Sequence, residues 1–293
     1  MASPSALQRT PLLVLALVGV VYVAFGAVMY SVQDRIVFPA TWLHAEQAAS
    51  VAPDGVEVIT LPHGTPLWVE GEHDRIVLMV HGNGEWVGNL HTGYGAPLDA
   101  LKFSFAAVEM RGVAGTAGPV REEPMVADVV EAVEALVERG WERDRIIVHG
   151  RSIGGGIASQ AVARTEVAGL VLESSFDSLI AVARRKLPAA LYPSFMVRTK
   201  LRSDVALDGL DLPVLQVHDI YDDVVGVARA RALREHLVNP TVVETAFHAH
   251  GAPIVLTDER AHLEWRRWLN RVVPRTDDAP LEIPVEARRP LGH

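Results

Sequence analysis

One short segment constrains this chain more than any other: Gly150–Gly154, which reads Gly-Arg-Ser-Ile-Gly. The apolar run Ile146–Val148 precedes it, and a helix-compatible stretch, residues 155–162, follows it. This order predicts a strand, a sharp turn and a helix, with the serine at the turn. Such a strained corner brings neighbouring main chain very close, and glycines on both sides of the serine avoid the clash. We therefore take Ser152 as the candidate nucleophile.

Apolar runs recur along the rest of the chain and alternate with helix-compatible stretches. They have the character of strands buried on both faces of a parallel sheet. The runs are Ile76–Val80, Phe103–Val108, Ile146–Val148, Leu170–Leu172, Val214–Val217 and Thr241–Ala246. Ahead of them, Val56–Leu61 and Leu67–Val69 flank a Pro-His-Gly-Thr turn and predict a hairpin. Residues 126–139 carry apolar side chains at helical spacing. The alternation predicts an α/β fold with a mostly parallel, doubly wound sheet flanked by helices and a site at the carboxyl ends of the strands.

A second strong signal is the uncharged apolar segment from Pro11 to Tyr30. It lacks the polar stripe of a core helix, and at about 1.5 Å per residue it spans roughly 30 Å, the thickness of bilayer hydrocarbon. We therefore expect one N-terminal transmembrane helix over 11–30, after a leader over 1–10. A cleaved signal peptide is the alternative, because Ala24–Gly26 fits a small-x-small cleavage site. We favour an uncleaved single-pass anchor. Arg9 and the amino terminus lie before the span, and Arg35, next to Asp34, lies after it, so we expect the domain outside the cytoplasm.

The remaining chain divides into three parts. Residues 31–53 have the character of a connecting stalk, and residues 54–273 hold the strand and helix alternation. A length of 293 residues accommodates one α/β domain of this size beside the anchor. Residues 274–293 are proline-rich, polar and aperiodic, which predicts a mobile C-terminal tail.

Composition excludes several classes of function. The net charge is -9, and the one basic stretch, Arg184–Lys186, reads as a solvated helix face. These features argue against a nucleic-acid partner and against electrostatic docking on anionic lipid. The chain has no cysteine. Disulfides, thiolate catalysis and cysteine-based zinc sites are therefore excluded, and the redox compartment stays open.

A serine nucleophile needs a base to take its proton and a carboxylate to orient that base. When Ser152 stands at a strand-to-helix turn of this kind, the acid and the histidine follow it in that order. The strand Val214–Val217 leads into a loop with three carboxylates, Asp219, Asp222 and Asp223. The acid is therefore expected from this loop.

The last predicted strand ends beside two histidines, His248 and His250, either of which can serve as the base. No acidic cluster of metalloenzyme spacing accompanies the pair, so we expect neither a metal nor another cofactor. The developing oxyanion needs two donors, commonly the amide after the nucleophile and one in the loop after an early strand. Ile153 supplies the first and Asn83 the second, with Gly84 as the alternative to Asn83.

Taken in order, the motifs resemble those of the α/β-hydrolase superfamily. The chain looks most like the membrane-anchored, serine-aminopeptidase-like members of this superfamily, and the resemblance covers residues 12–270. Gln33–Pro39 is similar to their segment after the anchor. The matching segments are His81–Gly84, Arg111–Gly118, Gly150–Gly155, Leu172–Phe176 and Pro213–Val225.

The resemblance implies roles for individual residues. The family pattern His-Gly-x-x-Asp-x-x-Val-Pro falls on residues 218–226 and implies Asp222 as the acid. Asp219 stands where glycine is usual and Gly226 where proline is usual, so Asp223 and Asp219 remain fallbacks.

The family's Gly-His motif falls on residues 249–250, with alanine in place of the glycine. It implies His250 as the base, with His248 as the alternative. A triad of Ser152, His250 and Asp222 implies a serine hydrolase that cleaves an ester, thioester or amide through an acyl-enzyme. Alternatives are a serine peptidase of the aminopeptidase type and a non-catalytic, membrane-tethered scaffold.

The short interval between Glu173 and Pro213 leaves room for a minimal cap of one or two helices, such as Ser178–Leu187. An open pocket near a membrane can accept a small acyl ester, a lipid or an acylated protein. Side chains beside the motifs are expected to be structural. We expect hydrogen bonds at His81, His149 and His218, a buried ion pair at Arg111, and packing at Trp86.

Overall fold

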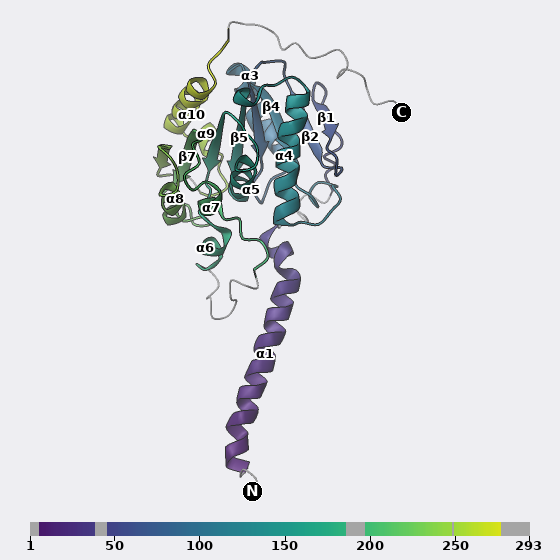
Figure 1. Ribbon diagram of the computed structural model, residues 1–293, viewed down its shortest axis with the longest axis vertical. Helices are drawn as coiled ribbons and strands as arrows, with labels where there is room; N and C mark the ends of the chain where they lie inside the picture. The colour runs from purple at the N-terminus through teal and green to yellow at the C-terminus, as the bar shows by residue number, and fades with distance from the viewer. Residues whose placement is uncertain (1–5, 39–45, 186–196, 248, 277–293) are drawn as a thin grey trace.

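The computed structural model describes residues 6–38, 46–185, 197–247 and 249–276. A sheet of eight strands lies among the helices, and one long helix projects from the lower end of this domain (Figure 1). The strand order is β1-β2-β4-β3-β5-β6-β7-β8. The strands are β1 Glu57–Thr60, β2 Pro66–Glu70, β3 Ile76–Val80, β4 Ser104–Val108, β5 Ile146–Arg151, β6 Gly169–Glu173, β7 Val214–Asp219 and β8 Thr241–Thr245.

The predicted hairpin and parallel sheet are confirmed. β1 pairs antiparallel with β2, and β2 pairs antiparallel with β4. From β4 to β8 every neighbouring pair is parallel. All residues of β3, β4, β5 and β6 are buried, as their continuous apolar runs predict.

Helices cover the sheet in the manner of a doubly wound fold. α4 and α5 pack together in front of the sheet in the view of Figure 1. α3 and α10 meet through an edge-to-face contact of Tyr94 and Trp265, whose ring centroids lie 6.4 Å apart. The helices of the domain are α3 Val87–Ala100, α4 Glu122–Glu138, the 3-10 helix η1 Arg143–Arg145, α5 Ile153–Val162, α6 Leu179–Ala183, α7 Ser203–Ala206, α8 Val227–Arg234, α9 Ile254–Thr257 and α10 Glu259–Val272.

The expected minimal cap is represented by α6, which is shorter than the predicted Ser178–Leu187. The Ser178 hydroxyl accepts a hydrogen bond from the Ala181 amide and caps the start of this helix. Residues 186–196, which include the end of the predicted helix, lie outside the described residues.

The long N-terminal helix, α1, runs over Ala6–Val37. Its stretch Leu13–Val37 is long and apolar enough to cross a membrane, with a mean hydropathy of 2.4 in its most apolar window. Only 6% of that window is buried against the domain. The helix continues past Tyr30 through residues 31–37, so the start of the predicted stalk is helical. Stalk residues 39–45 and tail residues 277–293 lie outside the described residues.

The end of α1 is fastened to the domain by Arg198. Its guanidinium donates to the carbonyl of Tyr30 at 2.9 Å and pairs with Asp34 at 3.0 Å. Its main-chain amide donates to the Gln33 side chain at 2.8 Å. These bonds extend the helix beyond the apolar run, because they give its last polar turn partners in the domain.

Candidate active site

Ser152 lies at the turn between β5 and α5 with backbone angles of φ 49° and ψ -117°. A positive φ costs a non-glycine residue free energy, and such strain gathers at functional sites. A Cβ at Gly150 would lie 2.5 Å from the Cα of Gly155, and one at Gly154 would overlap the carbonyls of Val80 and His81. The two motif glycines are therefore required by the close approach of main chain, as the sequence predicts.

The structure brings Ser152, His250 and Asp222 together from three separate segments. Ser152 Oγ lies 2.8 Å from His250 Nε2, and His250 Nδ1 lies 2.7 Å from Asp222 Oδ2. The second Asp222 oxygen accepts the amides of Val224 at 2.9 Å and Val225 at 2.7 Å. These bonds fix the carboxylate, so that it can hold the imidazole with its proton on Nδ1.

The loop that begins at the end of β7 and carries Asp222 is called the acid loop below. Its other two carboxylates do not contact His250 in the described part of the chain. Asp223 is exposed. Asp219 is buried and accepts three hydrogen bonds of 2.8 Å, from the amides of Tyr221 and Phe247 and from the hydroxyl of Thr245. Asp219 therefore joins the acid loop to the segment that leads to the base. His248, the alternative base, lies outside the described residues.

His218 supports the acid loop from behind. Its Nε2 donates to the Val225 carbonyl at 2.7 Å and lies 3.7 Å from Asp222 Oδ2. Burial lowers the pKa of His218 below its ordinary value, against the opposing effects of the Val225 carbonyl and of Asp222. A neutral imidazole thus holds the main chain next to the carboxylate of the acid.

The loop after β3 lies directly against Ser152. A Cβ at Gly82 would be 3.6 Å from the Cβ of Ser152. The amides of Asn83 and Ile153 donate to no acceptor in the described part of the chain. The Asn83 side chain is used differently, because its Nδ2 donates to the carbonyl of Val37 at the end of α1. Both amides are thus available to a ligand beside Ser152.

Arg151, the second residue of the motif, connects three loops around the nucleophile. Its guanidinium pairs with Glu85, whose other oxygen accepts the Gly82 amide at 2.8 Å. It also reaches the carbonyl of Gly251, beside the base, at 3.4 Å. No local sequence signal indicates this function, because Glu85 and Gly251 are far from Arg151 along the chain. It became visible only in three dimensions.

Glu173 forms a buried polar network beneath the strand-to-helix turn at Ser152, which we call the elbow. It accepts from Tyr94 at 2.9 Å and from the Val255 amide at 3.2 Å, and it pairs with His149 at 3.0 Å. Burial by itself raises the pKa of Glu173, but Arg151, His149 and the hydrogen bond from Tyr94 outweigh it and lower the pKa. The Glu173 carbonyl accepts the amide of Ser152 at 2.8 Å, so this network supports the nucleophile.

Other predicted structural roles are confirmed. His81 pairs with buried Glu109 at 2.6 Å, and Trp86 packs edge to face against Trp68 with ring centroids 5.7 Å apart. Arg111 donates two hydrogen bonds of 2.6 Å to Asp128. These bonds raise the pKa of Arg111.

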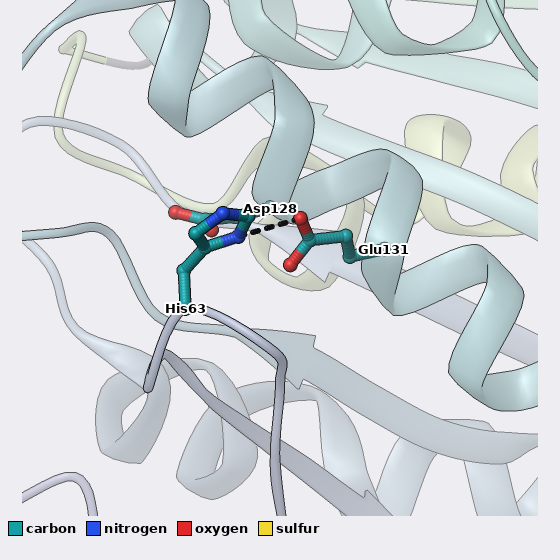
Figure 2. A group of neighbouring side chains, drawn as sticks. All are labelled: His63, Asp128 and Glu131. Carbon is teal, nitrogen blue, oxygen red and sulfur yellow. Dashed lines mark ion pairs between the residues drawn. The ribbon is translucent and has the colours of Figure 1, made fainter.

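Figure 2 shows His63, Asp128 and Glu131, whose ligand atoms lie close enough together to be considered for a metal ion. His63 bonds to Glu131 at 2.7 Å, and Arg111 takes both oxygens of Asp128. Arg111 thus already occupies both carboxylate oxygens of Asp128, so the group fits a metal poorly.

Comparison with known proteins agrees with this geometry. A family model described as "Serine aminopeptidase, S33" matches residues 71–210. Over 238 residues the chain is 26% identical to phosphatidylserine lipase ABHD16A from Bos taurus, covering 77% of this chain and 40% of that protein. Over 183 residues it is 28% identical to alpha/beta hydrolase domain-containing protein 17C from Mus musculus, covering 59% of this chain and 53% of that protein. The chain thus spans about half or less of the length of these relatives.

The fold also has solved counterparts. An esterase from Pyrococcus furiosus superposes with a TM-score of 0.60 at 20% identity, covering 74% of this chain and 89% of that one. The strand order, the elbow at Ser152 and the sequence relatives lead to one assignment. The chain belongs to the α/β-hydrolase superfamily.

Proposed function

We propose that the protein is a membrane-anchored serine hydrolase that cleaves carboxylic esters or thioesters through an acyl-enzyme on Ser152. The observation that carries this proposal is the hydrogen-bonded series from Ser152 through His250 to Asp222. Three side chains from distant segments meet in the order and spacing that activate a hydroxyl.

In this mechanism His250 Nε2 takes the proton of Ser152 Oγ as the oxygen attacks the substrate carbonyl. Asp222 holds His250 in the required tautomer and stabilises the imidazolium that forms. The amides of Ile153 and Asn83 bind the oxyanion of the tetrahedral intermediate. As the intermediate collapses, His250 gives its proton to the leaving alcohol or thiol. Water then attacks the acyl group, again losing a proton to His250, and Ser152 regains its own.

The substrate class that we propose is an acyl ester or thioester presented at a membrane surface. Two features support it: α1 is apolar and exposed, and its end bonds to the loop beside Ser152 through Asn83. One sequence relative is a phosphatidylserine lipase. We propose further that the domain lies outside the cytoplasm, because Arg9 and the amino terminus lie before the span, whereas Arg35 after it stands next to Asp34. No cofactor takes part in this mechanism.

A fluorophosphonate probe tests the proposal, because it labels activated serines covalently. The intact protein is expected to be labelled and to hydrolyse p-nitrophenyl esters, whereas Ser152→Ala and His250→Ala lose both properties. Ser50→Ala and His63→Ala are matched controls, since both residues are exposed and remote in sequence from the triad. An unlabelled but folded protein would instead support the non-catalytic scaffold.

A second candidate activity is an aminopeptidase, favoured by the family model that matches residues 71–210. Aminoacyl p-nitroanilides distinguish the two activities. Faster turnover of these amides than of matched acyl esters would move the proposal to a peptidase.

A further inference from the structure

A pocket of about 620 Å³ lies between α6, α7 and the start of α8. Four arginines line it: Arg184, Arg185, Arg202 and Arg229. The volume falls in the range of small-molecule sites, roughly 300–1,000 Å³. Four guanidinium groups around one hollow are notable in a chain whose net charge is -9. The positive charge is thus concentrated locally, against the overall balance.

The carboxylates at this pocket neutralise only half of these charges. Arg202 donates two hydrogen bonds to Asp204, at 2.7 and 2.8 Å, and Arg229 pairs with Asp177 at 3.1 Å. Arg184 and Arg185 make no ion pair within the described residues. Two guanidinium groups therefore remain for an anionic ligand. Guanidinium forks match the oxygens of a phosphate group especially well.

The pocket adjoins the loop that carries the proposed catalytic acid. A Cβ added at Gly226 would overlap the guanidinium of Arg185, so this side chain lies directly on the main chain there. Gly226 follows Val225, whose amide bonds to Asp222. A ligand held by Arg185 is consequently near the triad, although it is bound by different residues.

The pocket also lies at the end of the domain from which α1 projects. Figure 1 places α6 and α7 at this lower end. The same segment that carries Arg202 begins with Arg198, which bonds to Tyr30 and Asp34 of α1. If α1 spans a bilayer, the pocket lies at the end of the domain nearest the lipid headgroups.

We propose that this arginine pocket binds a phosphate group, carried by a phospholipid headgroup at the membrane surface. Arg184 and Arg185 are exposed, as the sequence predicts, and residues distant along the chain complete a pocket around them. Binding at this pocket uses no catalytic residue. The proposed phosphate site can therefore be tested independently of the proposed hydrolysis.

Calorimetric titration of the full chain in detergent tests the proposal. A Ser152→Ala background prevents turnover of the ligand. The probes are dihexanoyl phosphatidylglycerol, dihexanoylglycerol, which lacks the phosphate, and inorganic phosphate. The test variant is Arg184→Gln with Arg185→Gln, and Arg184→Lys with Arg185→Lys checks whether charge alone restores binding. The control is Arg260→Gln with Arg266→Gln, which removes two exposed charges from α10.

The phospholipid is expected to bind the parent protein. The double glutamine variant should bind it about tenfold or more weakly, because each lost hydrogen bond is charge-assisted. The lysine variant should bind at an intermediate affinity, and the α10 control should match the parent. Equal binding of dihexanoylglycerol would overturn the phosphate site, as would equal weakening by the α10 control. If inorganic phosphate binds as tightly as the phospholipid, the phosphate site stands, but the proposal that a phospholipid supplies the phosphate is overturned. An unchanged melting temperature shows that the glutamine variant is folded.

Discussion

The side-chain amide of Asn83 donates a hydrogen bond to the carbonyl of Val37, the last residue of α1. Asn83 also supplies one of the two main-chain amides that we assign to the oxyanion hole. A single residue thus joins the apolar helix to the loop beside Ser152. The proposed chemistry therefore lies close to the end of α1, and under the proposed function this is where an acylated lipid or protein would be presented.

Asn83→Ala separates these two contributions, because it removes the bond to Val37 and keeps the main-chain amide. We expect kcat toward soluble p-nitrophenyl esters to fall by much less than the ~10²–10³-fold typical of losing an oxyanion donor. Steady-state kinetics of the variant check this. A loss as large as that typical value would place the side chain, not the amide, in the oxyanion hole.

The three carboxylates of the acid loop are expected to differ sharply in their contributions. Asp222→Ala should reduce kcat about 10⁴-fold, as loss of a triad acid does. Asp223→Ala should leave kcat within about twofold, because exposed substitutions away from a site change little. The Asp223 variant is the matched control for the other two. A comparable loss in both would mean that both carboxylates are needed to orient His250.

Asp219→Ala should act by displacing the segment that leads to His250, because the Asp219 carboxylate bonds to none of the triad side chains. Its three donors would lose their acceptor, and the buried hydroxyl of Thr245 left unsatisfied costs roughly 1–3 kcal/mol. We expect a lower melting temperature and a lower kcat with little change in KM, because the segment leading to His250 is released. Asp219→Asn should restore part of both. A variant with normal stability and normal kcat would show that the loop is held by other contacts.

Arg151→Lys tests the connection between the loops around Ser152. Lysine keeps the charge but cannot bond Glu85 and Gly251 together in the same geometry. We expect kcat to fall about 10–100-fold, since a displaced catalytic group is costly. Glu85→Gln should reproduce much of this loss, and a double variant should lose less than the product of both effects. Multiplicative losses would show that the two residues act separately.

The lowered pKa of His218 predicts how the stability of the protein depends on pH. Its pKa is lowered by burial, so the folded state holds the neutral form while the unfolded state takes up a proton below about pH 6.5. Its contribution is therefore present above this pH and is lost as the pH falls toward the folded pKa. His218→Gln keeps a donor for Val225 without titrating. Its melting temperature should decline less than that of the parent between pH 6.5 and 5, and an equal decline would contradict this assignment.

Much of the architecture could be predicted from local pattern. Strands such as Ile76–Val80 are buried on both faces, so their apolar runs are continuous and easily recognised. The elbow is equally visible, because Gly150 and Gly154 are fixed by steric contact. Helix ends were harder. The apolar run ends at Tyr30, yet α1 continues to Val37 because Arg198 bonds to its last turns.

Side-chain partnerships between distant segments could not be predicted. Asp219 looked like a departure from the family pattern, but it is the acceptor for Thr245 and Phe247 on the neighbouring strand and loop. Arg184 and Arg185 are exposed, as predicted, but the pocket that α7 and α8 complete around them could not be foreseen. Such roles depend on which strands become neighbours, and that information is spread over the whole chain.

The most direct test of the central claim is the mass of the chain quenched in acid during turnover of p-nitrophenyl acetate, followed by peptide mapping. We predict an acetyl group on the peptide that contains Ser152. The Ser152→Ala variant should show neither this acetyl group nor turnover. Undiminished turnover by Ser152→Ala, or an acetyl group on another nucleophile that accounts for turnover, would contradict the acyl-enzyme mechanism.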